Sequence, residues 1–149
     1  MFLILASCHP NRVFDKNIDV PSTVWEKENI YELEFDISDP SLSYNIYFNL
    51  RNSVSYPFQN LYMEFEMENA EGNVINKELK NFELFDPKTG KPYGDGLGDL
   101  FDHRFLLLES YQFEKEGTYT IRMEQFMRVD NLPSVVSIGV MVEKASSKE

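Results

Sequence analysis

The chain has 149 residues, of which 42% are hydrophobic and 14% aromatic, and its formal net charge is -11 at pH 7. This length suits one domain with a sizeable core. The acidic balance repels phosphate backbones and anionic lipid head groups, which argues against nucleic-acid binding and against electrostatic adhesion to a membrane. The single cysteine excludes a disulfide framework. No apolar run approaches the length of about 18 residues that a transmembrane helix needs.

The N-terminus carries a pattern typical of a bacterial lipoprotein. An apolar run, residues 1–7, ends in small residues directly before Cys8, and polar sequence follows at once. Such a signal is cut before the cysteine, whose thiol is then acylated, with about 0.8 kcal/mol of membrane binding per buried methylene. The alternative is an ordinary buried strand with an unremarkable thiol. Because the basic n-region is absent and the apolar run is short, the recorded start is expected to be internal to a longer gene product.

The lipoprotein hypothesis divides the chain into four parts. Residues 1–8 are the signal remnant with a lipidated Cys8, and residues 9–29 form a flexible tether and entry segment. A β-sandwich spans residues 30–144, and a short polar tail covers residues 145–149. Within the entry segment, Val13 and Phe14 are expected to join the fold and Trp25 to cap the core. In this hypothesis the protein contacts the lipid bilayer only through the acyl chains on Cys8.

Strict alternation of apolar and polar residues dominates residues 44–68. A period of two predicts two strands, each with one face in a core and the other in water. In the first strand the inward residues are Tyr44, Ile46, Phe48 and Leu50, and the outward residues are Asn45, Tyr47, Asn49 and Arg51. In the second strand the inward residues are Leu61, Met63, Phe65 and Met67, and the outward residues are Tyr62, Glu64, Glu66 and Glu68. The predicted core places Phe48, Phe65, Ile121 and Val140 buried and facing one another.

Further strands are predicted on both sides of this pair. Residues 30–38, 117–127 and 136–142 alternate, whereas 104–108 is apolar on both faces, as in a central strand. Residues 52–57 form either a loop or a crossing between sheets, because they are too many for a two-residue hairpin turn. Residues 74–85 alternate weakly and fit a strand or a short helix. The glycine-rich residues 93–102 predict a shaped loop and not a strand.

Six or seven strands without an amphipathic helix predict an all-β fold, an antiparallel β-sandwich. Long strands and wide central loops favour a jelly-roll-like arrangement over an immunoglobulin-like one. The strand order is not readable from the sequence.

The sequence offers few residues for chemistry. Asp95, Asp99 and Asp102 are weak calcium candidates, since hard cations take carboxylate oxygens. Their spacing does not match an EF-hand loop, so aspartates that shape a surface turn are the favoured interpretation and no metal site is expected. Two histidines without a second cysteine are too few for a zinc site, and no nucleophile motif is present. We therefore expect no cofactor and no enzymatic activity.

Three outward-facing aromatic residues are the candidate contacts for a ligand. Tyr47 and Tyr62 lie on the polar faces of the central strands, and Phe126 lies on the polar face of its own strand. Exposed rings on a sheet stack on sugars or anchor a protein partner. The alternative is that another part of the chain covers that face.

The order and spacing of residues along the whole chain resemble the gliding-motility lipoprotein GldH family of Bacteroidetes. The matching residues are Cys8, Val13, Phe14, Trp25, Tyr44, Arg51, Asn52, Tyr56, Asn60, Leu61, Gly94, Gly96, Gly98, Asp99, Asp102, Gly117, Thr118, Tyr119, Met127, Arg128, Ile138 and Gly139. The resemblance implies a non-enzymatic, lipid-anchored accessory protein of the cell envelope, needed by the gliding machinery and linked through it to type IX secretion, whose envelope proteins would be its partners. A more general envelope role is also open, because members of the family occur in bacteria that do not glide. The family offers no catalytic residues.

Orientation in the envelope is expected to be periplasm-facing. Bacteroidetes lipoproteins bound for the cell surface resemble one another in carrying acidic residues after the cysteine, and here Cys8 is followed by His-Pro-Asn-Arg. The alternative function is a carbohydrate-binding β-sandwich module, suggested by Tyr47, Tyr62 and the glycine-aspartate segment.

Overall fold

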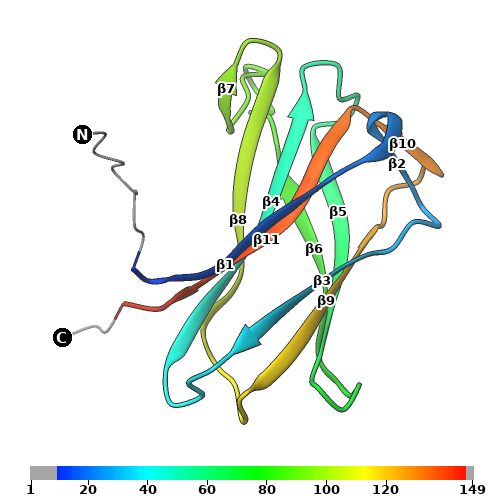
Figure 1. Ribbon diagram of the computed structural model, residues 1–149. Coiled ribbons are helices and arrows are strands. Elements are labelled where there is room, and N and C mark those ends of the chain that lie inside the picture. Colours follow the sequence, from blue (N-terminus) through cyan, green and yellow to red (C-terminus); the bar gives the residue numbers. More distant parts are fainter. Residues whose placement is uncertain (1–9, 147–149) are drawn as a thin grey trace, which may run out of the picture.

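The computed structural model describes residues 10–146, and strands account for nearly all of its regular structure (Figure 1). The strands are β1 (Arg12–Asp19), β2 (Val24–Glu26), β3 (Tyr31–Ile37), β4 (Ser43–Ser53), β5 (Asn60–Glu68), β6 (Val74–Glu83), β7 (Asp95–Leu97), β8 (Leu100–Gln112), β9 (Gly117–Gln125), β10 (Asn131–Pro133) and β11 (Val135–Lys144). A single 3-10 turn, η1 (Pro21–Thr23), lies between β1 and β2. The all-β prediction is confirmed.

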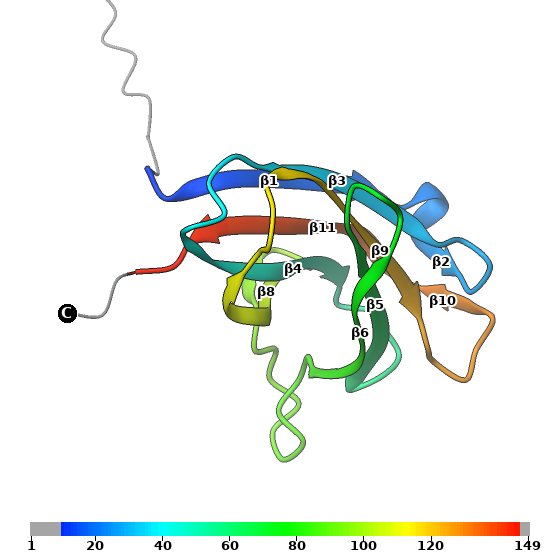
Figure 2. The ribbon, with the colours of Figure 1, turned by 90° about the horizontal axis from the view of Figure 1, so that it is seen from below.

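The strands form two antiparallel sheets that pack face to face (Figure 2). The β4 sheet has the order β1-β11-β4-β8-β7, and the β5 sheet has the order β3-β9-β5-β6; β10 and β2 form a separate short ribbon. With the three-residue strands β2, β7 and β10 left out and the others counted in chain order, the sheets are 1-8-3-6 and 2-7-4-5. This is the strand order of a jelly roll, so the jelly-roll-like prediction is also confirmed.

The core lies between the two sheets. Phe48 and Val140 of the β4 sheet and Phe65 and Ile121 of the β5 sheet are all 0% exposed, as predicted from their alternation. Phe48 and Val140 are register partners on neighbouring strands. Because β4 and β5 belong to different sheets, residues 54–59 carry the chain across the sandwich, which settles the choice between a loop and a crossing.

The expected tether is wrong for residues 12–26. β1 pairs with β11 in the β4 sheet from Arg12 to Asp19, and Trp25 is fully buried. The sandwich therefore begins at residue 12 and not at residue 30. The sequence did not predict β1 because this strand contains few apolar residues. It lies at the edge of the sheet, with one row of unpaired backbone groups, and among its inward positions only Phe14 and Ile18 pack against the core.

Two other segments form strands where the sequence was ambiguous or misleading. β6 is a strand at the edge of the β5 sheet, so the short helix is not formed. Its alternation is weak because Glu78 and Lys80 lie opposite the inward residues Phe65 and Met63 and pair with each other at 3.7 Å. Inward-pointing charges are a common feature of edge strands.

The glycine-rich segment, predicted to be a loop, is instead a hairpin of β7 and β8. Gly98 takes a positive φ of 65° at its turn, whereas Gly94 and Gly96 are required for space: a Cβ atom there would lie 2.7 Å from the backbone oxygen of Asp102 and from the ring of Phe101, respectively. β8 is also not a central strand, since only the three-residue β7 lies beyond it and Leu106 is 43% exposed.

Candidate functional site

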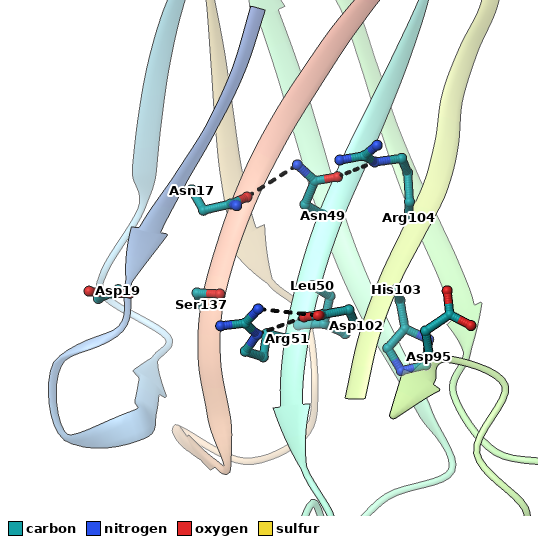
Figure 3. A pocket seen from close by; sticks show the side chains of 10 residues that line it. All are labelled: Asn17, Asp19, Asn49, Leu50, Arg51, Asp95, Asp102, His103, Arg104 and Ser137. Atoms are coloured by element: carbon teal, nitrogen blue, oxygen red, sulfur yellow. Dashed lines mark hydrogen bonds and ion pairs between the residues drawn. The ribbon is translucent and has the colours of Figure 1, made fainter. Parts of the chain in front are cut away.

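The outer face of the β4 sheet carries a polar cleft of about 580 Å3 (Figure 3). Its lining residues are Asn17, Asp19, Asn49, Leu50, Arg51, Asp95, Asp102, His103, Arg104 and Ser137. Because outward side chains alternate along each strand and the strands are in register, most of these residues fall into two rows that cross the sheet. The two rows can be followed in Figure 3 as the side chains above and below.

The first row is held together by Asn49 at its centre. Asn17 of β1, Gly139 of β11, Asn49 of β4 and Arg104 of β8 are register partners in turn. The Nδ2 atom of Asn49 donates to Oδ1 of Asn17 at 3.1 Å, and Nε of Arg104 donates to Oδ1 of Asn49 at 2.8 Å. Asn49 is only 8% exposed, so its amide is a fixed floor of the cleft.

Gly139 leaves the space that this row needs. A Cβ atom at Gly139 would collide with the Oδ1 atom of Asn17 and with the backbone oxygen of Lys16. Only glycine allows the Asn17 side chain to lie across β11 and reach Asn49. A small residue in the middle of a strand therefore marks a close approach between side chain and backbone.

The second row runs through Arg51. Asp19, Ser137, Arg51, Asp102 and Asp95 are successive register partners on β1, β11, β4, β8 and β7. Nε and Nη2 of Arg51 donate to the two carboxylate oxygens of Asp102 at 2.7 and 3.2 Å, a bidentate pair. These hydrogen bonds and the negative charge of Asp102 raise the pKa of the Arg51 guanidinium.

An amphipathic third row borders the cleft. Asp15, Met141, Tyr47 and Leu106 are register partners, and the hydroxyl of Tyr47 donates to Oε1 of Glu143 at 3.0 Å. Burial of Tyr47 and, to a smaller extent, this hydrogen bond raise the pKa of its hydroxyl. The Asp15 carboxylate joins the rows, because it accepts from Nδ2 of Asn49 at 3.1 Å and from Nη2 of Arg104 at 3.3 Å.

The calcium candidates do not converge. Asp95 and Asp102 face each other across the hairpin, but both oxygens of Asp102 accept from Arg51. Asp99 lies at the hairpin turn, where its backbone oxygen accepts from the Val54 amide at 2.8 Å. Within residues 10–146 no group of three or more carboxylate, histidine or cysteine side chains is close enough to hold a metal ion.

His103 lies beneath the hairpin with 7% of its surface exposed. Its ring stacks on Phe105 with a centroid distance of 5.3 Å, and a Cβ atom at Gly94 would lie 2.8 Å from its Nε2 atom. That nitrogen has no hydrogen-bond partner among the described residues. Burial lowers the pKa of His103, although the charges of Asp102 and Asp95 oppose the shift.

A second surface, the aromatic groove, lies on the outer face of the β5 sheet. It has a volume of about 470 Å3 and is lined by Phe58, Tyr62, Leu79, Phe126, Met127 and Arg128. Tyr62 is 40% exposed, Phe126 39% and Leu79 54%. The amide of Phe126 donates to the backbone oxygen of Tyr62 at 2.8 Å, which holds these two residues side by side.

The structure therefore separates the three aromatic candidates. Tyr62 and Phe126 share the aromatic groove, whereas Tyr47 lies on the outer face of the other sheet, beside the polar cleft. The sequence does not identify Asn17, Ser137 or Arg104 as parts of a cleft. A usable signal was the outward series Asn45, Tyr47, Asn49 and Arg51, which is unusually rich in planar hydrogen-bonding groups, together with Gly139 inside the last strand.

Comparison with known proteins decides the family. The profile of the family described as GldH lipoprotein matches residues 12–142, nearly the whole sandwich. The chain belongs to the GldH lipoprotein family. A curated protein of Christiangramia forsetii, named a gliding motility lipoprotein GldH homolog, is 26% identical over 152 residues, which cover 97% of this chain and 91% of that protein. The gliding motility lipoprotein GldH of Flavobacterium johnsoniae is 26% identical over 149 residues, with 95% of this chain and 91% of that protein covered.

The GldH match and the structure both begin after the predicted lipidation site. Cys8 lies outside the described residues, four positions before the first residue of the match. Across residues 10–146 the structure contains no helix with the length and hydrophobicity to cross a membrane.

Proposed function

We propose that this GldH family member is a lipid-anchored accessory protein of the cell envelope that supports the gliding machinery, is linked through it to type IX secretion, and catalyses no reaction. The observation that carries the proposal is the family match over residues 12–142, together with relatives of nearly equal length that are named gliding motility lipoproteins. Acylation of Cys8 would hold the sandwich at the bilayer, with the domain facing the periplasm.

The aromatic groove is the surface that we assign to a protein partner in that machinery. Tyr62, Leu79 and Phe126 expose apolar surface on a sheet whose other outward residues are mainly charged or polar. Exposed apolar patches with a polar rim mark protein contacts, and aromatic residues dominate the energy of such contacts. The adjacent Arg128 offers a cation to an acidic group of the partner.

The side chains of the polar cleft support the proposal that the protein is not an enzyme. The facing aspartates Asp95 and Asp102 are the pair that a glycoside-cleaving reaction would call on, one carboxyl as general acid and the other as base or nucleophile. The bidentate hydrogen bonds from Arg51 occupy both oxygens of Asp102. Asp102 is therefore held by Arg51, and neither of its oxygens is free of a protein partner.

Replacement of the native protein tests the proposal. A strain of Flavobacterium johnsoniae without its own GldH would receive this chain behind a complete lipoprotein signal. We expect gliding to return with the wild-type chain, and the protein to be found in the membrane fraction. Cys8→Ser should move the folded protein to the soluble fraction and abolish gliding.

The partner surface needs its own variant and control. Tyr62→Ser combined with Phe126→Ser should leave the protein folded and membrane-bound but prevent gliding, because the apolar anchors are lost. Val74→Ser changes an equally exposed apolar residue at the other end of β6 and should glide normally. Wild-type gliding by the double variant would refute the groove as the partner surface, and failure of the membrane-bound wild-type chain to restore gliding would refute the functional proposal.

A further inference from the structure

The polar cleft contains cross-strand hydrogen bonds that are separate from the aromatic groove proposed to bind a protein partner. Five strands contribute to one of its rows, and residues separated by more than 80 positions in the chain, Asn17 and Arg104, are connected through Asn49. At the usual strand spacing the row spans roughly 20 Å. A surface built for solubility alone needs no such cross-strand network.

The network fixes the side chains and still leaves hydrogen-bonding groups available. Among the described residues, no hydrogen bond occupies Nδ2 of Asn17, Nη1 of Arg51 or the carboxylate of Asp19. The Ser137 hydroxyl lies between Asp19 and Arg51 in the second row. The cleft therefore presents both donors and acceptors at fixed positions, which suits groups that donate and accept at once.

The charges in the cleft restrict the chemical class of ligand that can bind there. Three aspartates and two arginines line the cleft, Arg51 is paired with Asp102, and Arg104 is paired with Asp15 at 3.3 Å. No uncompensated cation remains for a phosphate or sulfate. The carboxylates also do not gather into a cation site. Asp19 and Asp95 have no ion-pair partner among the described residues, so they disfavour an anionic ligand and can accept hydrogen bonds from hydroxyl groups. Because the amide, guanidinium and hydroxyl groups of the cleft also donate, a neutral polar ligand fits it better than a cationic one.

The bordering row completes an amphipathic surface. The half-buried Tyr47 and the exposed Leu106 are register partners one row away from Asn49 and Arg104, about 7 Å along the strands. A sugar ring has hydroxyl groups on its rim and an apolar C–H face. Hydroxyls can bind to the two polar rows while the C–H face lies on Tyr47 and Leu106.

We infer that the polar cleft of the β4 sheet binds a neutral, polyhydroxylated ligand, namely a segment of an uncharged glycan chain. Vicinal hydroxyls pair with the planar groups of Asn17, Arg51 and Arg104, and the jelly roll holds the glycan across the strands. The site is on the face opposite the aromatic groove, so glycan and protein partner can bind at the same time.

A glycan microarray with neutral and acidic oligosaccharides, probed with the full 149-residue chain, tests the inference. The strongest neutral binder is then titrated into the isotope-labelled chain and followed by NMR. We expect saturable binding with amide shifts centred on Asn17, Asn49 and Ser137. Arg51→Ala and Asn17→Ala should each weaken binding by about tenfold in chains whose NMR spectra remain those of a folded protein, because each removes a direct hydrogen-bond donor.

Arg122→Ala is the matched control, since Arg122 is an ion-paired arginine on the outer face of the other sheet. It should bind as the wild type does. The inference is overturned by binding of sulfated or carboxylated glycans alone, by equal affinities of the Arg51 and Arg122 variants, or by the absence of shifts at millimolar oligosaccharide. Any of these results leaves the lipoprotein assignment untouched, because that assignment rests on the family match and on Cys8.

Discussion

The two outer faces of the sandwich are built from the same alternating strands but differ in how their side chains interact. On the β4 sheet, outward residues bond to one another across β1, β4 and β8. On the β5 sheet, glutamates are the commonest outward residues, and they form ion pairs: Arg122 contacts Glu32 at 2.5 Å and also Glu68, and Lys77 contacts Glu64 at 3.6 Å. The β5 sheet ends in the aromatic groove instead of a polar cleft.

This difference shows that polarity and connectivity are separate properties of a sheet face. Both faces have the polar alternation of a strand in water. On the β4 sheet, amides and guanidiniums connect side chains of β1, β4 and β8, because an amide both donates and accepts. On the β5 sheet, Arg122 and Lys77 pair with glutamates of neighbouring strands, and the other glutamates repel one another. The hydrogen-bonded outer face of the β4 sheet is suited to bind a ligand. The acidic outer face of the β5 sheet disfavours contact except at the aromatic groove.

The largest effect is expected from the core that supports both faces. Phe65→Ala removes a fully buried ring between the sheets and should lower the free energy of unfolding by about 3 to 5 kcal/mol. Denaturant titration measures the change. Glu66→Ala, the next residue on the outer face, should change the stability by less than about 0.5 kcal/mol. Equal stability of the Phe65 variant and the wild type would contradict the assigned faces.

A smaller loss is expected where the hydrogen-bonded outer face of the β4 sheet is packed most tightly. Gly139→Val places side-chain atoms where Asn17 and the Lys16 backbone lie, so β1 must move and stability should fall by about 1 to 3 kcal/mol. Hydrogen exchange should show faster opening of the β1 amides. Thr120→Val, at an outward position of β9, provides the control and should keep exchange slow. Unchanged protection of β1 in the glycine variant would show that this approach is not tight.

The contrast between network and ion pairs can be measured directly. Asn49→Ala removes an amide that is bonded to Asp15, Asn17 and Arg104, at an expected loss of about 1 to 3 kcal/mol. Arg122→Ala removes the ion pairs of Arg122 with Glu32 and Glu68 and should cost about 1 kcal/mol or less, since exposed pairs contribute little. Thermal denaturation of both variants tests the order. A larger loss at Arg122 would reverse our account of the two faces.

The smallest expected effect concerns pH and His103 below the cleft. Burial lowers the pKa of His103 in the folded chain, so near and below pH 6.5 the unfolded chain binds the proton more readily. The stability contributed by the neutral imidazole is complete above pH 6.5 and is lost as the pH falls toward the lower folded value.

A comparison of slopes isolates the histidine. Melting temperatures between pH 7.5 and 5.5 should fall more steeply on acidification for the wild type than for His103→Gln, which has no group that titrates there. Parallel curves for the two proteins would mean that the His103 pKa is not lowered by folding.

Faces could be predicted from the sequence, whereas contacts between strands could not. The alternation of Tyr44 to Arg51 correctly assigned inward Phe48 and outward Asn49, because a period of two is a local property. The cleft depends on the register of β1, β11, β4 and β8, which are distant in the chain and whose pairing leaves no local trace. The edge strands β1 and β6 were hard to predict because one edge of each faces water. Such strands need fewer apolar residues, so their alternation is weak.

The pairing of β1 with β11 also determines how the protein responds to force. The antiparallel pairing runs from Arg12 opposite Glu143 to Asp19 opposite Ser137, and the polar cleft is lined by Asn17 and Asp19 at the second of these two ends of β1. With Cys8 acylated as we propose, a force between the lipid and a partner bound at the Asp19 end would act along β1. The hydrogen bonds between β1 and β11 would then be loaded in shear, so that they all resist the force together instead of breaking one after another. Forced unfolding follows the rate of barrier crossing, so this geometry favours a long lifetime under tension.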